Sequence, residues 1–143
     1  MAKKATNRQL TNVKLLNAPA VLQNLPVERV WPVRGRITTY FSNYHQGIDI
    51  ANSWGTSVHP FASGVVVFAG WQGSFGNCIF ITHNQGLVTT YAHLGRIEVK
   101  VGQQVGIDTE IGVIGSTGNS TGPHLHFQLS ENGHNVNPLR ALP

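Results

Sequence analysis

Two short motifs place histidine and aspartate at spacings that suit metal binding. His45 and Asp49 are four residues apart, and Asp49 lies in the alternating run Gly47-Ile48-Asp49-Ile50. Residues four apart lie on one face of a β-strand, whereas Gly47 and the β-branched isoleucines disfavour a helix. The pattern therefore predicts that an imidazole and a carboxylate converge on one point.

The second motif is His124-Leu125-His126-Phe127, preceded by the polar loop 118–123. On a strand, both imidazoles point to one face while Leu125 and Phe127 point to the other. Two neighbouring imidazoles on a strand favour a metal or catalytic site.

A third motif, Tyr91-Ala92-His93, would put Tyr91 and His93 on a common strand face.

Together, the motifs suit a catalytic zinc site. Such a site uses three protein ligands and leaves one position for water, and imidazole and carboxylate are suitable donors. Bound zinc lowers the pKa of water to about 7, and further histidines can move protons. The helical His-Glu-x-x-His motif is absent. Only Asp49 among the acidic residues falls in these motifs, so a histidine is the predicted proton acceptor.

The elements that position these motifs are predicted to be short strands. All sixteen glycines lie beyond residue 34, between β-branched or aromatic runs at 64–69, 78–82, 87–91 and 111–114. Such spacing is typical of an all-β sandwich or barrel, and Asn84-Gln85-Gly86 reads as a hairpin loop.

The chain has 143 residues, which suits one domain. Its net charge of +4 arises within residues 1–30, which hold five Lys or Arg residues against Glu28. Such a basic leader can contact anionic polymers or serve as a solvated linker. We find no apolar run long enough to span a membrane and no signal-peptide pattern. The single Cys78 excludes an intramolecular disulfide and is predicted to be buried.

Residues 99–105 and 111–115 resemble the strands of lipoyl- and biotinyl-carrier domains. Those carriers place a lysine at the tip of a tight hairpin, and the turn here, 106–109, has none. A carrier function is therefore disfavoured.

Residues 31–143 resemble the M23 (LytM or lysostaphin-like) zinc metallopeptidase domain. The resemblance is carried by ordered motifs along the chain: Trp31-Pro32-Val33, His45-x-x-x-Asp49, Gly64-Val65-Val66, Tyr91-Ala92-His93-Leu94, Gly102-Gln103, Gly112, 118–127 and Val136-Asn137-Pro138. It implies an all-β fold, a two-sheet antiparallel sandwich or half-barrel of the duplicated hybrid motif type, after a mostly irregular segment 1–30.

The resemblance also implies roles for particular residues. His45, Asp49 and His126 match the Zn²⁺ ligands, and His93 and His124 match the catalytic histidines. Tyr40 and Tyr44 are both candidates for binding substrate or the oxyanion. The implied activity is endopeptidase cleavage of peptidoglycan stems or cross-bridges. Some relatives have lost ligands and activate other wall hydrolases, so a non-catalytic wall-binding or activating module is the alternative.

These expectations describe a monomer whose partner is peptidoglycan, with no nucleic acid and no membrane span. The location would be extracellular, periplasmic or phage-associated. His59, His83 and His134 are expected to have packing or surface roles, and folding of Asn12 or Asn17 over the metal is a further possibility.

Overall fold

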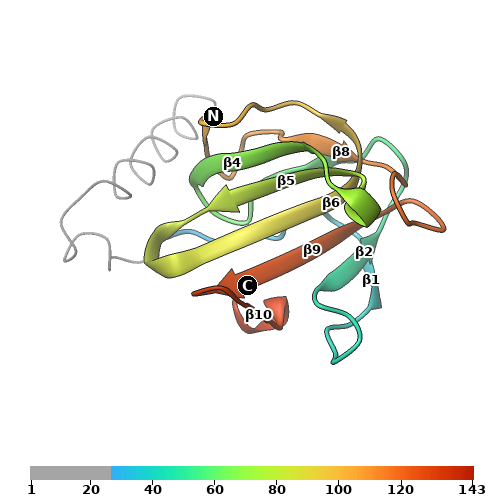
Figure 1. Ribbon diagram of the computed structural model, residues 1–143, viewed down its shortest axis with the longest axis horizontal. Helices are drawn as coiled ribbons and strands as arrows, with labels where there is room; N and C mark the ends of the chain where they lie inside the picture. Colours follow the sequence, from blue (N-terminus) through green and yellow to red (C-terminus); the bar gives the residue numbers. More distant parts are fainter. Residues whose placement is uncertain (1–26) are drawn as a thin grey trace.

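The structure, a computed structural model, describes residues 27–143 (Figure 1). Nearly all of the predicted leader 1–30, with Asn12 and Asn17, lies outside the described residues. Three short 3-10 helices, η1 (Gly73–Phe75), η2 (Asn84–Gly86) and η3 (Pro138–Arg140), accompany the strands. The strands are β1 (Arg36–Thr39), β2 (Ile48–Ala51), β3 (Ser57–Val58), β4 (Gly64–Trp71), β5 (Asn77–Thr82), β6 (Leu87–Ile97), β7 (Gln104–Val105), β8 (Gly112–Ile114), β9 (His124–Glu131) and β10 (His134–Val136).

The strands pair in the order β1-β2-β9-β6-β5-β4-β7, and every pairing is antiparallel. Strand β10 pairs with β9, while β8 pairs with the far end of β6 and with β3. Figure 1 shows β9, β6, β5 and β4 side by side across the middle of the molecule. The predicted all-β antiparallel fold is confirmed, and so is the hairpin loop at 84–86 between β5 and β6.

The hydrophobic core lies on one face of this main sheet. Alternation along β2 and β9 sends Ile48, Ile50, Leu125 and Phe127 into the core, where each is at most 1% exposed. They pack in one cluster with side chains from the β3, β7 and β8 region, namely Val58, Val105, Ile111 and Ile114. The opposite face of β2 and β9 is therefore free to carry polar side chains. Among residues 27–143, no helix is long and apolar enough to cross a membrane.

A chain of hydrogen bonds runs through buried side chains of the core. While His83 is neutral, its donors and acceptors can be assigned in only one way. The Nδ1 of His83 lies 2.9 Å from the Ser63 carbonyl, which can only accept, so this nitrogen donates. In the neutral ring Nε2 must then accept from Thr89 Oγ1 at 2.7 Å, and Thr89 must accept from the Tyr91 hydroxyl at 2.7 Å. Tyr91 in turn accepts from the Phe61 amide at 2.9 Å. While His83 is neutral, this chain links the start of β4 to β5 and β6 with each donor matched to an acceptor.

We predict that this histidine makes the fold sensitive to acid. Burial lowers the pKa of His83 from 6.5 to about 4, partly opposed by the hydrogen bond to Ser63 and assisted by the charge of Arg29. The unfolded chain therefore takes up the proton first, and the free energy of unfolding falls as the pH drops from 6.5 towards 4. The loss is about 3 kcal/mol over that interval.

Urea unfolding between pH 7.5 and 4, with a chelator present throughout, measures this dependence. His83→Gln removes the titrating group, so its stability is expected to be lower at neutral pH but to vary less between pH 6.5 and 4. Parallel pH profiles for the two proteins would contradict the assignment to His83.

Candidate active site

The pairing of β2 with β9 brings the first two motifs together. Asp49 lies directly opposite His126, and Ala51 lies opposite His124. Because successive side chains alternate, these polar residues occupy the face of the sheet opposite the core. His45, just before β2, is held by a bridge to Ser42 and lies on the same face, four residues from Asp49.

His45, Asp49 and His126 form a cluster in which one potential ligand atom from each residue lies within 4.8 Å of the others. The Nε2 of His45 is 3.1 Å from Asp49 Oδ2, and the Nδ1 of His126 is 2.9 Å from Asp49 Oδ1. Two ligands of a tetrahedral zinc at ordinary bond lengths lie about 3.3 Å apart. The spacing therefore needs only small adjustments to fit such an ion.

The hydrogen bonds on the far side of both rings support this fit. His45 Nδ1 lies 2.8 Å from the Gly47 carbonyl and must donate to it. His126 Nδ1 donates to Asp49 Oδ1 at 2.9 Å, and its Nε2 lies 2.9 Å from the side-chain amide of Gln128. In a neutral His45 ring, the Nε2 that faces Asp49 carries a lone pair directed at a carboxylate. A cation between them would turn this repulsion into attraction, and partners behind ligating histidines are typical of metal centres.

His124 and His93 stand beside this cluster with their rings similarly fixed. His124 Nδ1 donates to the Gly122 carbonyl at 2.8 Å, and His93 Nδ1 donates to the Thr117 carbonyl at 2.8 Å. Their ring centroids are 4.9 Å apart, and His124 Nε2 is 3.6 Å from Asp49 Oδ1. In the neutral rings, both Nε2 atoms are thus left as proton acceptors.

His93 reaches this face through an irregularity in β6. Its φ of +62° lies in the left-handed region, which a non-glycine residue adopts only when the surroundings hold it there. The prediction that Tyr91 and His93 share a face is wrong. Tyr91 is fully buried opposite Phe127, whereas His93 contacts the rings of His124 and His126. The left-handed turn at His93 interrupts the alternation on which the prediction relied.

The electrostatics of the site follow from partial burial. Burial raises the pKa of Asp49, but the hydrogen bond from His126 and the charges of the three nearby histidines outweigh it, so this pKa lies below its ordinary value. Burial lowers the pKa of His93, and the neighbouring His124 and His126 lower it further, against the Thr117 hydrogen bond and Asp49. His93 is therefore neutral at pH 7 and able to accept a proton.

A pocket of about 310 Å³ opens over these groups. The motif analysis missed three residues beside it. Phe75 stacks on His126 with ring centroids 5.6 Å apart, Gln128 holds the back of the same ring, and Thr117 holds His93. The pocket is lined by His45, Asp49, Ser74, Phe75, His93, Asn119, Ser120, Thr121, His124 and His126.

Tyr40 and Tyr44 do not line this pocket. They are 60% and 98% exposed, on the segment between β1 and β2 that leads to His45. The remaining histidines lie elsewhere: His83 is buried and hydrogen-bonded, and His134 is exposed on β10. These two positions agree with the packing and surface roles expected for them.

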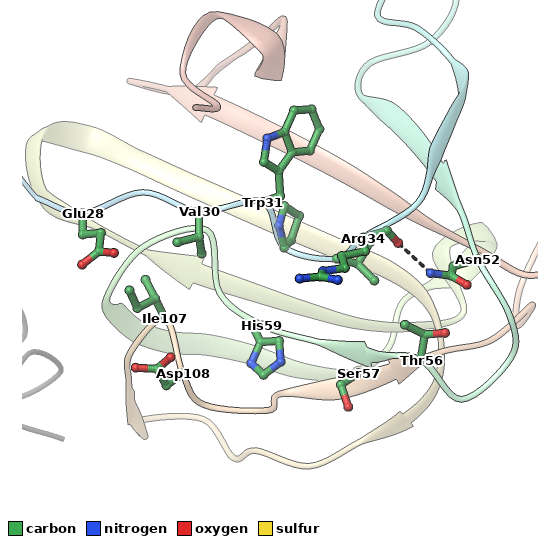
Figure 2. Close-up of a pocket in the computed structure, with 12 residues that line it drawn as sticks. Glu28, Val30, Trp31, Arg34, Asn52, Thr56, Ser57, His59, Ile107 and Asp108 are labelled. Carbon is green, nitrogen blue, oxygen red and sulfur yellow. Dashed lines mark hydrogen bonds between the residues drawn. The ribbon is translucent and has the colours of Figure 1, made fainter. Parts of the chain in front are cut away.

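A second pocket, of about 610 Å³, contains none of the five predicted site residues. Figure 2 shows Arg34 and His59 extending into the space between the segment 28–34 and the turn at Ile107 and Asp108. His59 Nδ1 donates to the Thr109 carbonyl at 3.1 Å, which is the packing role expected for it. The described residues hold their one His–Asp–His cluster in the first pocket.

The chain is a small all-β domain, an antiparallel β-sheet that carries on its outer face a His–Asp–His cluster able to hold a metal ion. The family model for peptidase family M23 matches residues 43–138, and the chain belongs to that family. It is 47% identical over 100 residues to the DD-carboxypeptidase/endopeptidase Mpg of Neisseria meningitidis, covering 69% of this chain and 23% of that protein. It is 39% identical over 117 residues to the murein hydrolase activator NlpD of Escherichia coli, covering 79% and 31%.

Solved structures show the same fold. A zinc-containing peptidase from Vibrio cholerae superimposes with a TM-score of 0.76 at 32% identity, over 82% of this chain and 41% of that one. The chain spans about a quarter to a third of the length of the two curated relatives.

We predict that the loops beside the pocket depend on Gly118. Its φ is +74°, and a Cβ placed there would overlap the Gly76 nitrogen and the Ser74 oxygen, which are backbone atoms that cannot move aside cheaply. Gly118→Ala is expected to lower the free energy of unfolding by about 1–3 kcal/mol and to displace the loop that carries Phe75.

Gly122→Ala is the matched control, because Gly122 lies in the same loop and a Cβ there would meet nothing within 4 Å. Thermal unfolding of both variants measures the difference. Equal melting temperatures for the two would refute the crowding argument.

Proposed function

We propose that this chain is a zinc-dependent endopeptidase that hydrolyses peptide bonds in peptidoglycan stems or cross-bridges. The observation that carries the proposal is the convergence of three ligand atoms, from His45, Asp49 and His126, beneath two histidines whose Nε2 atoms are free to accept protons. We further propose that residues 31–143 are the peptidase domain and residues 1–30 a basic leader.

In this proposal the zinc ligands are the cluster atoms themselves, namely His45 Nε2, one Asp49 carboxylate oxygen and His126 Nδ1. Gly47 and Gln128 orient the two imidazoles from behind. When bound, zinc supplies Lewis acidity, which polarises a carbonyl and makes water more acidic.

The remaining work falls to the two other histidines. His124 Nε2, the nearer to Asp49, takes the proton from the attacking water, and His93 lies 4.9 Å away between ring centroids to share it. Either ring, once protonated, stabilises negative charge on the substrate oxygen and returns a proton to the leaving amine. Tyr40 and Tyr44 are candidates for a further contact with that oxygen if the segment 40–45 moves on binding.

The substrate class is proposed from the relatives, since the chain spans only part of their length. Mpg is described as a DD-carboxypeptidase/endopeptidase, and another relative, ShyA of Vibrio cholerae, as a peptidoglycan DD-endopeptidase. A site of action outside the cytoplasm, extracellular, periplasmic or phage-associated, follows from this substrate.

A second candidate is a non-catalytic module that binds wall peptide or activates another hydrolase. The similarity to the murein hydrolase activator NlpD favours it. The set of His45, Asp49, His93, His124 and His126 favours the enzyme, because a module that only binds has no need of two free proton acceptors beside a ligand cluster.

We expect two substitutions to separate metal binding from proton transfer. His124→Ala should keep zinc affinity within a few fold but lower turnover by at least about 100-fold, because a proton acceptor is lost. Asp49→Ala should lose most zinc affinity, because it removes the carboxylate common to both ligand contacts. Zinc affinity is measured by competition with a chromogenic chelator, and turnover with a soluble wall peptide.

His134→Ala controls for the loss of a histidine, since His134 is exposed on β10 away from the pocket. It should match the unaltered protein in both measurements. Full turnover by His124→Ala would exclude the role proposed for His124.

Digestion of purified walls tests the activity itself. We expect soluble fragments with new amine ends, detected by mass spectrometry, from a glycine-bridged wall or a directly cross-linked wall, and no fragments once a chelator is added. Fragment masses name the bond that is cut. Zinc-loaded protein that binds both walls and cuts neither would reject the endopeptidase in favour of the binding module.

A further inference from the structure

His93 lies in β6, and its backbone is in the left-handed region. The ring makes a hydrogen bond of 2.8 Å from Nδ1 to the carbonyl oxygen of Thr117. A carbonyl only accepts, so this contact selects the tautomer with the proton on Nδ1 and the lone pair on Nε2. The position of one backbone carbonyl thus decides whether His93 can accept a proton over the pocket.

The carbonyl of Thr117 is in turn fixed by the Thr117 side chain. Its hydroxyl donates to the Leu94 carbonyl at 2.7 Å, which is the residue after His93 on β6. The same hydroxyl accepts from the Asn77 amide at 3.1 Å, and the Asn77 side chain reaches the Leu94 carbonyl at 3.2 Å. Thr117 is therefore bound to the strand of His93 both through its backbone and through its side chain.

The same contacts reach the other wall of the pocket. Asn77 begins β5 directly after the η1 segment that carries Phe75, and the Asn119 amide donates to the Ser74 carbonyl at 2.8 Å. Phe75 stacks on the His126 ring. One hydroxyl group thus stands where the strand of His93, the loop 116–120 and the Phe75 segment meet.

We propose that Thr117 is a positioning residue, whose hydroxyl holds its own carbonyl against His93 and so keeps the His93 Nε2 free as a proton acceptor. Only the kinetic part of this inference rests on the proposed function. The tautomer of His93 is a property of the folded protein and is measurable without substrate.

Thr117→Val keeps the shape of the side chain and removes the hydroxyl, and Thr117→Ser restores it. In zinc-loaded protein, long-range ¹H–¹⁵N correlation spectra should show His93 protonated on Nδ1 in the unaltered chain and in Thr117→Ser. Thr117→Val should show a mixture of tautomers.

On wall peptide, the kcat of Thr117→Val should fall by about tenfold or more, while its KM and zinc affinity stay nearly unchanged. The loss should not exceed the roughly 10⁴-fold fall in kcat that follows when a catalytic histidine is in the wrong tautomer.

Thr56→Val is the matched control, because it also removes one threonine hydroxyl that donates to a carbonyl, that of Ser53 at 2.8 Å, outside the pocket. It should leave the His93 spectrum and kcat unchanged. The inference is overturned if Thr117→Val keeps the His93 tautomer, or if Thr117→Ser is as impaired as Thr117→Val. A His93 protonated on Nε2 in the unaltered protein would also overturn it, without any variant.

Absence of all wall cleavage by the unaltered protein would instead contradict the proposed function. The spectroscopic comparison of the three proteins would still decide the role of Thr117.

Discussion

The pairing of Asp49 with His126 across β2 and β9 is the contact on which the rest of the arrangement depends. A register shift of one residue between the two strands would turn one of these side chains into the core and bring Leu125 or Ile50 to the opposite face. Burial of those apolar neighbours therefore selects the same register that assembles the polar cluster. The free energy that stabilises the fold and the geometry that gathers the ligands come from one pairing.

Orientation within the cluster has a separate origin. Three of the four histidines, His45, His93 and His124, donate from Nδ1 to backbone carbonyls, and His126 Nε2 pairs with the side chain of Gln128. The strand pairing decides where each ring lies, whereas these partners decide which nitrogen faces the pocket. Three of the partners belong to loops, so loop geometry controls the chemistry of residues held by a rigid sheet.

Much of this could be predicted from residue spacing alone. The period of two in a strand was enough to put His124 with His126 and to separate both from Leu125, and the glycine-bounded runs indicated an all-β fold. The same rule misplaced His93, because a single left-handed residue reverses the face and no residue type at that position signals it. Phe75 and Thr117 were missed because their segments are far apart in the sequence. The Asn77 amide bonds to Thr117, 40 residues further along the chain, and Gly76 and Gly118 allow the two segments to approach closely.

The one-way hydrogen-bond chain behind the sheet restricts how this domain can evolve. Each member donates one hydrogen bond and accepts another. Replacing Thr89 alone by an apolar residue would therefore leave the His83 Nε2 without a donor and the Tyr91 hydroxyl without an acceptor. Neighbouring positions must therefore change together or not at all. Across related sequences, His83, Thr89 and Tyr91 should vary as a linked group, passing between a few self-consistent combinations with the intermediate ones depleted.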